Sequence, residues 1–330
     1  MINVLFFDGV TPKPYNGATL LNEPMGGTEA TVIRIATRLA KGFNVFVAQH
    51  NATETTVHDS VVYGPIEACA MKPNVVVCLR EPGYLKDLKE TYPEARLVLW
   101  CHDLPSPRIL EYGFSILNTG THVLGVSHWH SELLYAQFIS GGRPVLKPTY
   151  IYNPISDTLG PLTKEFNPHK LVFMSSPHKG LGRTLEVFKE LRKKDNRYEL
   201  HLANPGYLAC ADTKDEGVVN HGPLTHDKLL TLVSDAVGVL HLNKVFPETF
   251  GIVHAEANAL GVPFLTDFNN GAVQELIDHP GEMINTDDTG AVITRIQEWS
   301  EGRRPKVRAN GMFRLSRVID EWYRLIRGTR

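Results

Sequence analysis

The sequence lacks several features that would assign it to a broad class at once. Neither sign of charge predominates, because 34 Lys and Arg oppose 36 Asp and Glu, so a strongly basic nucleic-acid binder is excluded. No run approaches the ~18 apolar residues of a membrane span. The first apolar run, 2–7, has no basic segment before it and meets Asp8-Gly9 too soon for a signal peptide. We expect a cytoplasmic protein, with peripheral attachment to a membrane as the alternative.

Cysteine is scarce and its spacing is uninformative for metal or redox chemistry. No two of the four cysteines, at positions 69, 78, 101 and 210, form a C-x-x-C pair. Three of them lie in apolar runs, which favours buried, reduced thiols.

Several catalytic motifs are absent as well. The chain has no phosphate-binding G-x-x-x-x-G-K-[ST], no G-x-G-x-x-G after its first apolar run and no G-x-S-x-G. These absences argue against an NTPase, a nicotinamide enzyme and a serine hydrolase. D-x-D and H-E-x-x-H are missing too, and His128 and His130 have poor spacing for a metal on a helix. We therefore predict no metal and no resident cofactor.

Short apolar runs alternate with amphipathic stretches along the whole chain. This alternation is typical of βαβ units and predicts parallel sheets. Strands are expected at 2–7, 44–49, 74–79, 96–101, 122–126, 171–174, 198–203, 236–242 and 263–266. Helices are expected at 28–41, 127–139, 181–193, 226–233 and 251–260.

The chain divides at a proline-rich stretch, which has five prolines between 144 and 168. We predict an α/β protein with two Rossmann-like, doubly wound parallel-sheet domains, 1–155 and 156–309, facing a central cleft. Because open α/β sheets bind ligands at the carboxyl ends of their strands, that cleft is the expected site.

The C-terminal segment, 310–330, is predicted to be an amphipathic helix that packs back toward the N-terminal domain. The tail from 303 carries nine Lys and Arg against one Asp and one Glu. A docking helix with a solvated face is the main interpretation, and weak contact with an anionic surface, lipid or DNA, is the minor one.

The most informative run is 245–263, VFPETFGIVHAEANALGVP. The free N–H groups of Gly251, Ile252 and Val253 at a helix start, together with the helix dipole, suit a diphosphate. Glu256 inside that helix would accept two vicinal hydroxyls, as a ribose presents them, and Glu248 would reach the other side of the phosphates. The competing interpretation is a capped helix with two exposed glutamates.

Residues 248–263, followed by Asn270-Gly271-Ala272-Val273-Gln274-Glu275, resemble the donor-binding signature of retaining glycosyltransferases of family 4, which have the GT-B fold. The resemblance covers nearly the whole chain and is densest from 171 to 276. It implies transfer of a sugar from a UDP- or GDP-linked donor to a hydroxyl acceptor, with retention and with no named protein base. The oligomeric state is left open.

Other segments follow the same family order. Met25-Gly26-Gly27-Thr28-Glu29 resembles its glycine loop, where Gly26 and Gly27 would allow close approach of the donor. Trp100-Cys101-His102-Asp103 resembles the strand end that carries its cleft histidine, His102. The resemblance further implies donor contacts at Lys179, His178, Gly222, Pro223 and Phe250, with His102, Glu248 and Lys179 as the catalytic set.

The sequence departs from the family pattern at a charged position. The family usually has an Arg five residues before the loop lysine, where this chain has Met174. Arg183 or His178 would supply the missing charge. Ala272 and Ile155 replace family glycines, which are milder changes.

Three alternatives stay open. One is another GT-B reaction, such as epimerisation or phosphorolysis. The second is a noncatalytic sugar-nucleotide-binding scaffold, which Met174 favours. The third is a GT-B enzyme that glycosylates a modified nucleobase in DNA, in place of a glycan or a lipid-linked sugar.

Overall fold

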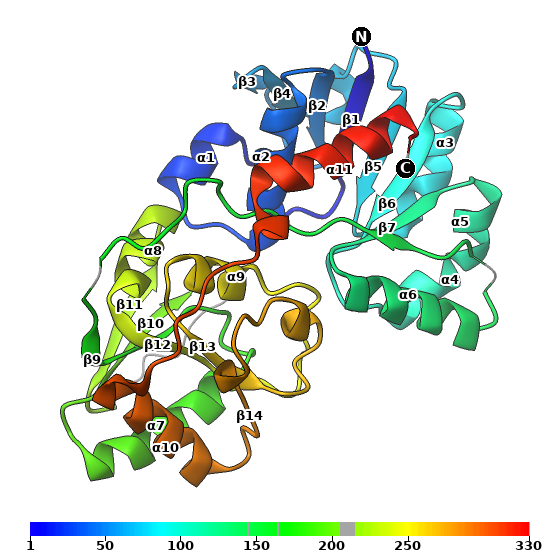
Figure 1. Ribbon diagram of the computed structural model, residues 1–330. Helices are drawn as coiled ribbons and strands as arrows, with labels where there is room; N and C mark the ends of the chain where they lie inside the picture. The colour runs from blue at the N-terminus through cyan, green and yellow to red at the C-terminus, as the bar shows by residue number, and fades with distance from the viewer. Residues whose placement is uncertain (144, 164, 205–214, 330) are drawn as a thin grey trace. The chain divides into compact units, whose positions relative to one another are not determined.

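The chain folds into two compact units (Figure 1). A computed structural model describes residues 1–143, 145–163, 165–204 and 215–329. Unit 1 contains Met1–Leu20, Gly27–Pro154 and Arg314–Arg330, and unit 2 contains Leu21–Gly26 and Ile155–Phe313. The chain thus crosses between units near residues 154 and 313, close to the predicted 155 and 309. The short excursion at 21–26 was not predicted. Pro144 and Cys210, which figured in the sequence arguments, lie outside the described residues.

Unit 1 is built on an eight-stranded sheet in the order β3-β4-β2-β1-β5-β6-β7-β8. All its pairings are parallel except that of β3 with β4. The strands are β1 (Asn3–Asp8), β2 (Asn44–Gln49), β3 (Thr56–His58), β4 (Val61–Gly64), β5 (Val75–Leu79), β6 (Arg96–Trp100), β7 (His122–Gly125) and β8 (Thr149–Tyr150). Its helices are α1 (Gly17–Asn22), α2 (Gly27–Leu39), α3 (Leu85–Thr91), α4 (Pro107–Glu111), α5 (Gly113–Asn118), α6 (His128–Ser140) and α11 (Leu315–Arg327).

Unit 2 is built on a six-stranded, wholly parallel sheet in the order β11-β10-β9-β12-β13-β14. The strands are β9 (Asn167–Phe173), β10 (Glu199–Asn204), β11 (Val218–Pro223), β12 (Ala236–His241), β13 (Phe264–Asp267) and β14 (Met283–Ile284). The helices are α7 (Leu181–Lys194), α8 (His226–Ser234), α9 (Ile252–Ala259) and α10 (Thr289–Glu298). The predicted doubly wound α/β class is confirmed in both units.

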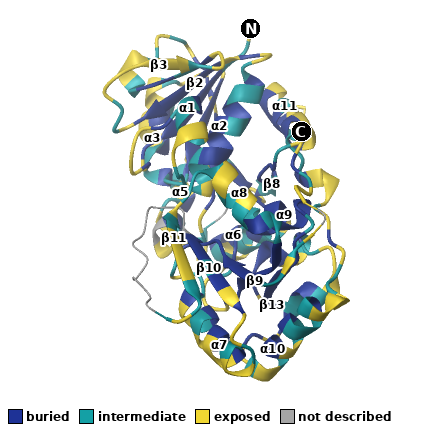
Figure 2. Ribbon diagram, turned by 90° about the vertical axis from the view of Figure 1, so that its left-hand side faces the viewer, coloured by how far each residue is buried: buried dark blue, intermediate teal, exposed yellow. Residues whose placement is uncertain are grey.

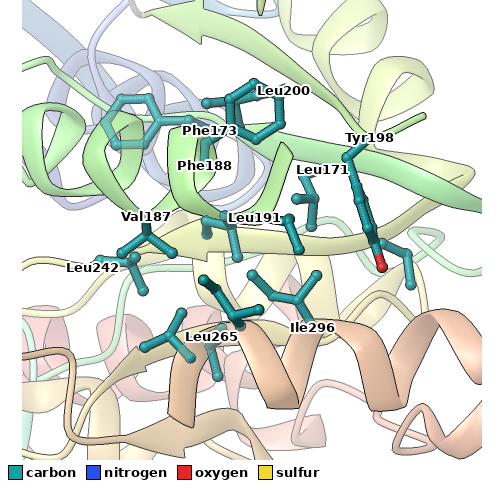
Figure 3. Close-up of a cluster of buried hydrophobic side chains, with 14 of the residues drawn as sticks. Leu171, Phe173, Val187, Phe188, Leu191, Tyr198, Leu200, Leu242, Leu265 and Ile296 are labelled. Atoms are coloured by element: carbon teal, nitrogen blue, oxygen red, sulfur yellow. The ribbon is translucent and has the colours of Figure 1, made fainter. Parts of the chain in front are cut away.

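Each sheet is the centre of its unit's core. The central strands are buried along most of their length, and β12 is buried at all six positions, as expected of parallel strands covered on both faces (Figure 2). In unit 2 one large cluster joins α7 and α10 to one face of the sheet (Figure 3). Its members include Phe173, Phe188, Leu200, Leu265 and Ile296. This packing fixes the strands whose carboxyl ends carry the candidate site.

The C-terminal helix predicted for 310–330 is α11, and it belongs to unit 1. Trp322 is fully buried, with its ring centroid 4.6 Å from that of Trp100 and 5.8 Å from that of Phe6. The basic residues of the tail are divided between the units: positions 303, 304, 306 and 308 belong to unit 2, and positions 314, 317, 324 and 327 belong to unit 1. Arg330 lies outside the described residues. Within the described ranges no helix has the length and apolar character that crossing a bilayer requires.

Arg96 holds the last turn of α11. Its Nη2 donates to the carbonyls of Leu325 and Ile326, at 3.1 and 2.5 Å, in the last turn of the helix, where carbonyls lack i+4 donors. We expect Arg96→Ala to cost about 1–3 kcal/mol locally, since it removes two charge-assisted hydrogen bonds. Hydrogen exchange of the α11 amides should speed up accordingly. Lys86→Ala on exposed α3 is the control, and equal protection in both variants would contradict the role assigned to Arg96.

Candidate functional site

The centre of the candidate site is an ion pair between two loops of unit 2. Lys179 lies between β9 and α7, and Glu248 lies between β12 and α9. The Lys179 Nζ is 2.8 Å from Oε1 and 2.9 Å from Oε2 of Glu248. Because both loops follow carboxyl ends of parallel strands, two residues 69 positions apart meet at one sheet edge.

The environment keeps Glu248 charged although it is buried. Only 6% of the residue is exposed. Burial alone would raise the pKa of its carboxyl group, but Lys179 and, to a lesser extent, His241 lower that pKa below its ordinary value. The arrangement concentrates a carboxylate and an ammonium group at the edge of the sheet.

Helix α9 begins next to this ion pair. Gly251 precedes the helix with a φ of +88°, in the left-handed region that favours glycine, and turns the chain from the Glu248 loop into the helix. The first N–H groups of any helix lack intrahelical acceptors, so Ile252 and Val253 stand at an electropositive end. The resemblance implied a donor contact at Phe250, but the ring of this residue is buried and packs against Phe313, with the two ring centroids 5.4 Å apart. Its side chain therefore belongs to the core.

Glu256 projects from the same helix toward α8. Its Oε1 lies 2.7 Å from Nε2 of His226, the first residue of α8, and only 3% of Glu256 is exposed. Both glutamates of the informative run are thus buried and partnered. The interpretation of a capped helix with two exposed glutamates is wrong.

The carboxyl end of β11, shortly before α8, is open at Gly222 and Pro223. Gly222 has a φ of +65°, and a Cβ built there would meet nothing within 4 Å. Pro223 is exposed. His178, beside Lys179, is exposed too, and its ring pairs with Phe246 at a centroid distance of 5.3 Å. Burial and the neighbouring Lys179 lower the pKa of His178, so it is neutral at neutral pH and supplies no fixed charge.

Three predicted residues remain: His102 and Gly27 belong to unit 1, and Gly26 belongs to unit 2. His102 follows β6, is 7% exposed and packs on Trp100 at a centroid distance of 4.4 Å. Burial, with Arg80 and His130, holds its pKa well below the usual range, so the imidazole is neutral. Gly26 groups with unit 2 and Gly27 begins α2 in unit 1.

Comparison with known proteins rests on structure alone, since no protein-family model and no curated protein matches the sequence. Anabaena Alr3699/HepE in complex with UDP and glucose is similar over 99% of this chain and 100% of its own, with a TM-score of 0.66 and 15% identity. The lipopolysaccharide outer core galactosyltransferase WaaB is similar over 100% of both chains, with a TM-score of 0.66 and 13% identity. The pneumococcal O-GlcNAc transferase GtfA in complex with UDP and GlcNAc gives a TM-score of 0.66 at 16% identity over 84% of this chain.

This protein has the GT-B fold. The chain spans 63% of the GtfA chain, less than two thirds of that protein. At identities of 13–16%, these likenesses show the fold only.

Within this GT-B chain, Arg183 does not lie where the sequence argument needed it. Its guanidinium donates to the carbonyls of Thr286 and Asp287 and to Oγ1 of Thr289, at 2.8–3.2 Å, and to Glu186 at 3.3 Å. Nε and Nη2 therefore tie α7 to the start of α10 and the loop before it, whereas Nη1 bonds within α7. Met174 is 4% exposed, so its position is part of the core. Arg183 is engaged elsewhere and His178 is neutral, so the geometry favours neither of these two residues as the source of the missing positive charge.

Arg183→Met tests this correction. We expect the free energy of unfolding to fall by about 1–3 kcal/mol, because several charge-assisted hydrogen bonds are lost. Affinity for a nucleoside diphosphate should not change. Urea-induced unfolding and calorimetric titration measure the two quantities, with exposed Arg197→Met as the control. A large loss of nucleotide affinity at unchanged stability would show that Arg183 contributes to the donor site and would contradict this correction.

Sequence reasoning missed three residues that contact the predicted ones. His226 lies three positions beyond Pro223, and its position after Thr225, at a helix start, was the available signal. His241 lies near the end of an expected strand, where a buried polar residue is itself a signal, and Asn270, quoted above only for the family resemblance, lies in the loop after β13. Among the described residues, no group of three or more His, Cys, Asp or Glu is arranged to hold a metal ion.

Proposed function

We propose that the protein is a glycosyltransferase that moves a glycosyl group from a nucleoside-diphosphate sugar to a hydroxyl acceptor, with retention and without a metal ion. The observation that carries the proposal is the Lys179–Glu248 pair beside the start of α9, with Glu256 buried on the same helix. An ammonium group and free N–H groups match a diphosphate, and a carboxylate one turn further along matches the ribose hydroxyls.

The proposed chemistry follows from the charge that develops. When the glycosyl bond to the donor breaks, negative charge grows on the leaving phosphate, and only groups that bind this charge more strongly in the transition state accelerate the step. Lys179 and the N–H groups at Gly251–Val253 would supply that stabilisation. Glu248 would contact the donor sugar, and neutral His102 would donate or accept a hydrogen bond to it. Retention rests on the sequence resemblance.

The donor to test first is UDP-linked. Two of the similar structures, GtfA and HepE, contain UDP, which supports this choice. The acceptor is proposed only as a hydroxyl group, on a glycan, a lipid-linked sugar or a modified nucleobase.

One observation favours a second candidate, a noncatalytic sugar-nucleotide-binding scaffold. Met174 is buried and Arg183 is engaged elsewhere, so the charge expected five residues before Lys179 is not replaced from either position. Such a protein would bind the donor but leave it intact.

Binding and turnover together test both candidates. UDP, GDP, ADP and the common sugar conjugates of these nucleotides are titrated calorimetrically into the wild-type protein, with and without EDTA. Release of the nucleoside diphosphate from the sugar conjugates is then followed. Binding of one nucleotide that EDTA does not affect, with sugar transfer or slow hydrolysis, is the expected result. Binding without any turnover would favour the scaffold, and no binding would overturn the donor site.

A further inference from the structure

His241 is the last residue of β12, and its side chain lies next to the Glu248 carboxylate. It is 1% exposed, and its Nε2 is 3.5 Å from Glu248 Oε1, too long for a hydrogen bond. Among the described residues this Nε2 has no hydrogen-bond partner. A buried polar group without a partner is costly, and such groups in native proteins call for an explanation.

The hydrogen bonds of Asn270 determine which nitrogen of His241 carries the proton. The backbone N–H of Glu248, which can only donate, lies 3.3 Å from Asn270 Oδ1. The amide nitrogen of Asn270 therefore points the other way, to Thr266 Oγ1 at 2.9 Å and to His241 Nδ1 at 3.1 Å. Nδ1 must accept this hydrogen bond, which leaves the proton of neutral His241 on Nε2, facing Glu248.

His241 is neutral over most of the pH range in which the protein would work. Burial lowers its pKa to about 4, although Glu248 acts in the opposite direction. The group that faces Glu248 is thus an uncharged N–H donor whose orientation is fixed by Asn270.

The main chain of Glu248 is held, whereas its side chain has two partners within reach. Its carbonyl accepts a hydrogen bond from the Ala272 N–H at 2.9 Å. Gly271, with a φ of +63°, passes so close that a Cβ there would lie 2.5 Å from the same carbonyl oxygen. With its backbone fixed, the carboxylate can exchange Lys179 for His241 by a small rotation of its side chain.

We propose that His241 is a positioning residue. Its Nε2–H forms a hydrogen bond to the Glu248 carboxylate when Lys179 leaves that carboxylate to bind the phosphate of the donor. The inference rests on the proposed function, in which Lys179 binds the diphosphate. Without a second partner, departure of Lys179 would leave a buried carboxylate unpaired, which is strongly unfavourable. The Nε2–H of His241 replaces the lost contact with a charge-assisted hydrogen bond, and no proton changes place.

The first test needs no donor. Lys179→Met removes the lysine partner permanently, so Glu248 should close on His241 in the free protein. In protein labelled with ¹⁵N-histidine, we expect the Nε2–H tautomer of His241 in the wild type, and in the variant a downfield shift and slower solvent exchange of Hε2. The Nδ1–H tautomer, or an Hε2 signal that Lys179→Met leaves unchanged, would overturn the proposal.

The second test compares two replacements of His241. His241→Gln keeps an N–H donor of similar reach, and His241→Leu removes it at similar size. We expect His241→Leu to weaken binding of UDP about tenfold, as the loss of one hydrogen bond to a charged group does, and His241→Gln to recover most of that loss. Equal binding by both variants contradicts the proposal.

The two tests separate this inference from the proposed function. If the wild type binds no nucleoside diphosphate, the proposed function fails. The NMR measurement on Lys179→Met still decides whether His241 forms the hydrogen bond to Glu248. If UDP binds and Hε2 does not respond to Lys179→Met, the role of His241 fails alone. Should His241→Leu not fold, the Lys179→Met measurement retains its full force.

Discussion

Lys179→Met is expected to lower kcat for glycosyl transfer by about 10²–10³-fold, the usual effect of removing one preorganised group that stabilises developing negative charge. Methionine keeps most of the length of the lysine stem, so the loop between β9 and α7 should retain its packing. The expected loss is larger in kcat than in donor affinity, because charge on the leaving phosphate grows as the bond breaks. Steady-state kinetics with the donor identified by titration measures both.

Lys193→Met is the matched control for this variant. Lys193 lies on α7 in the same unit, is 70% exposed and pairs with Glu190 on the surface. Its replacement should change neither kinetics nor stability beyond about 0.5 kcal/mol. If Lys179→Met retained wild-type kcat, the proposed role of the ammonium group would have to be abandoned, and the ion pair with Glu248 would be merely structural.

Much of the fold follows from the sequence because parallel strands have a strong signature. Runs such as 75–79 and 236–240 are apolar throughout, and the structure buries them fully. The short edge elements were not predicted. Strands β3 and β8 have three and two residues, and their register depends on neighbouring strands rather than on any local pattern.

The candidate site was predictable where one local segment carries the chemistry. The run containing Glu248, Gly251 and Glu256 places all three on one loop and helix, and the structure keeps them together. The partners of these residues depend on contacts across the sheet, which a single sequence does not display. His226 and His241 come from other segments, and Arg183 looked suitable by spacing alone yet bonds to the loop before α10.

Glu256→Ala is expected to weaken binding of the nucleoside diphosphate by about 10–100-fold, the range for hydrogen bonds to a charged group. The carboxylate is buried and bonded to His226 through Oε1, which orients the group on α9. If the ribose is what it binds, the loss should fall on affinity, with kcat at saturating donor much less affected. Calorimetric titration and steady-state kinetics separate the two effects.

Inorganic pyrophosphate distinguishes a ribose contact from a general disturbance of the helix. Pyrophosphate has no ribose, so its binding at Lys179 and the start of α9 should be the same in the wild type and in Glu256→Ala. Glu190→Ala, at an exposed position of α7, controls for loss of a negative charge from unit 2. A parallel loss of pyrophosphate affinity would mean that Glu256 supports α9 through His226 rather than binding the ribose. In that case His226→Ala, which breaks the same bond from the other side, should reproduce the defect in full.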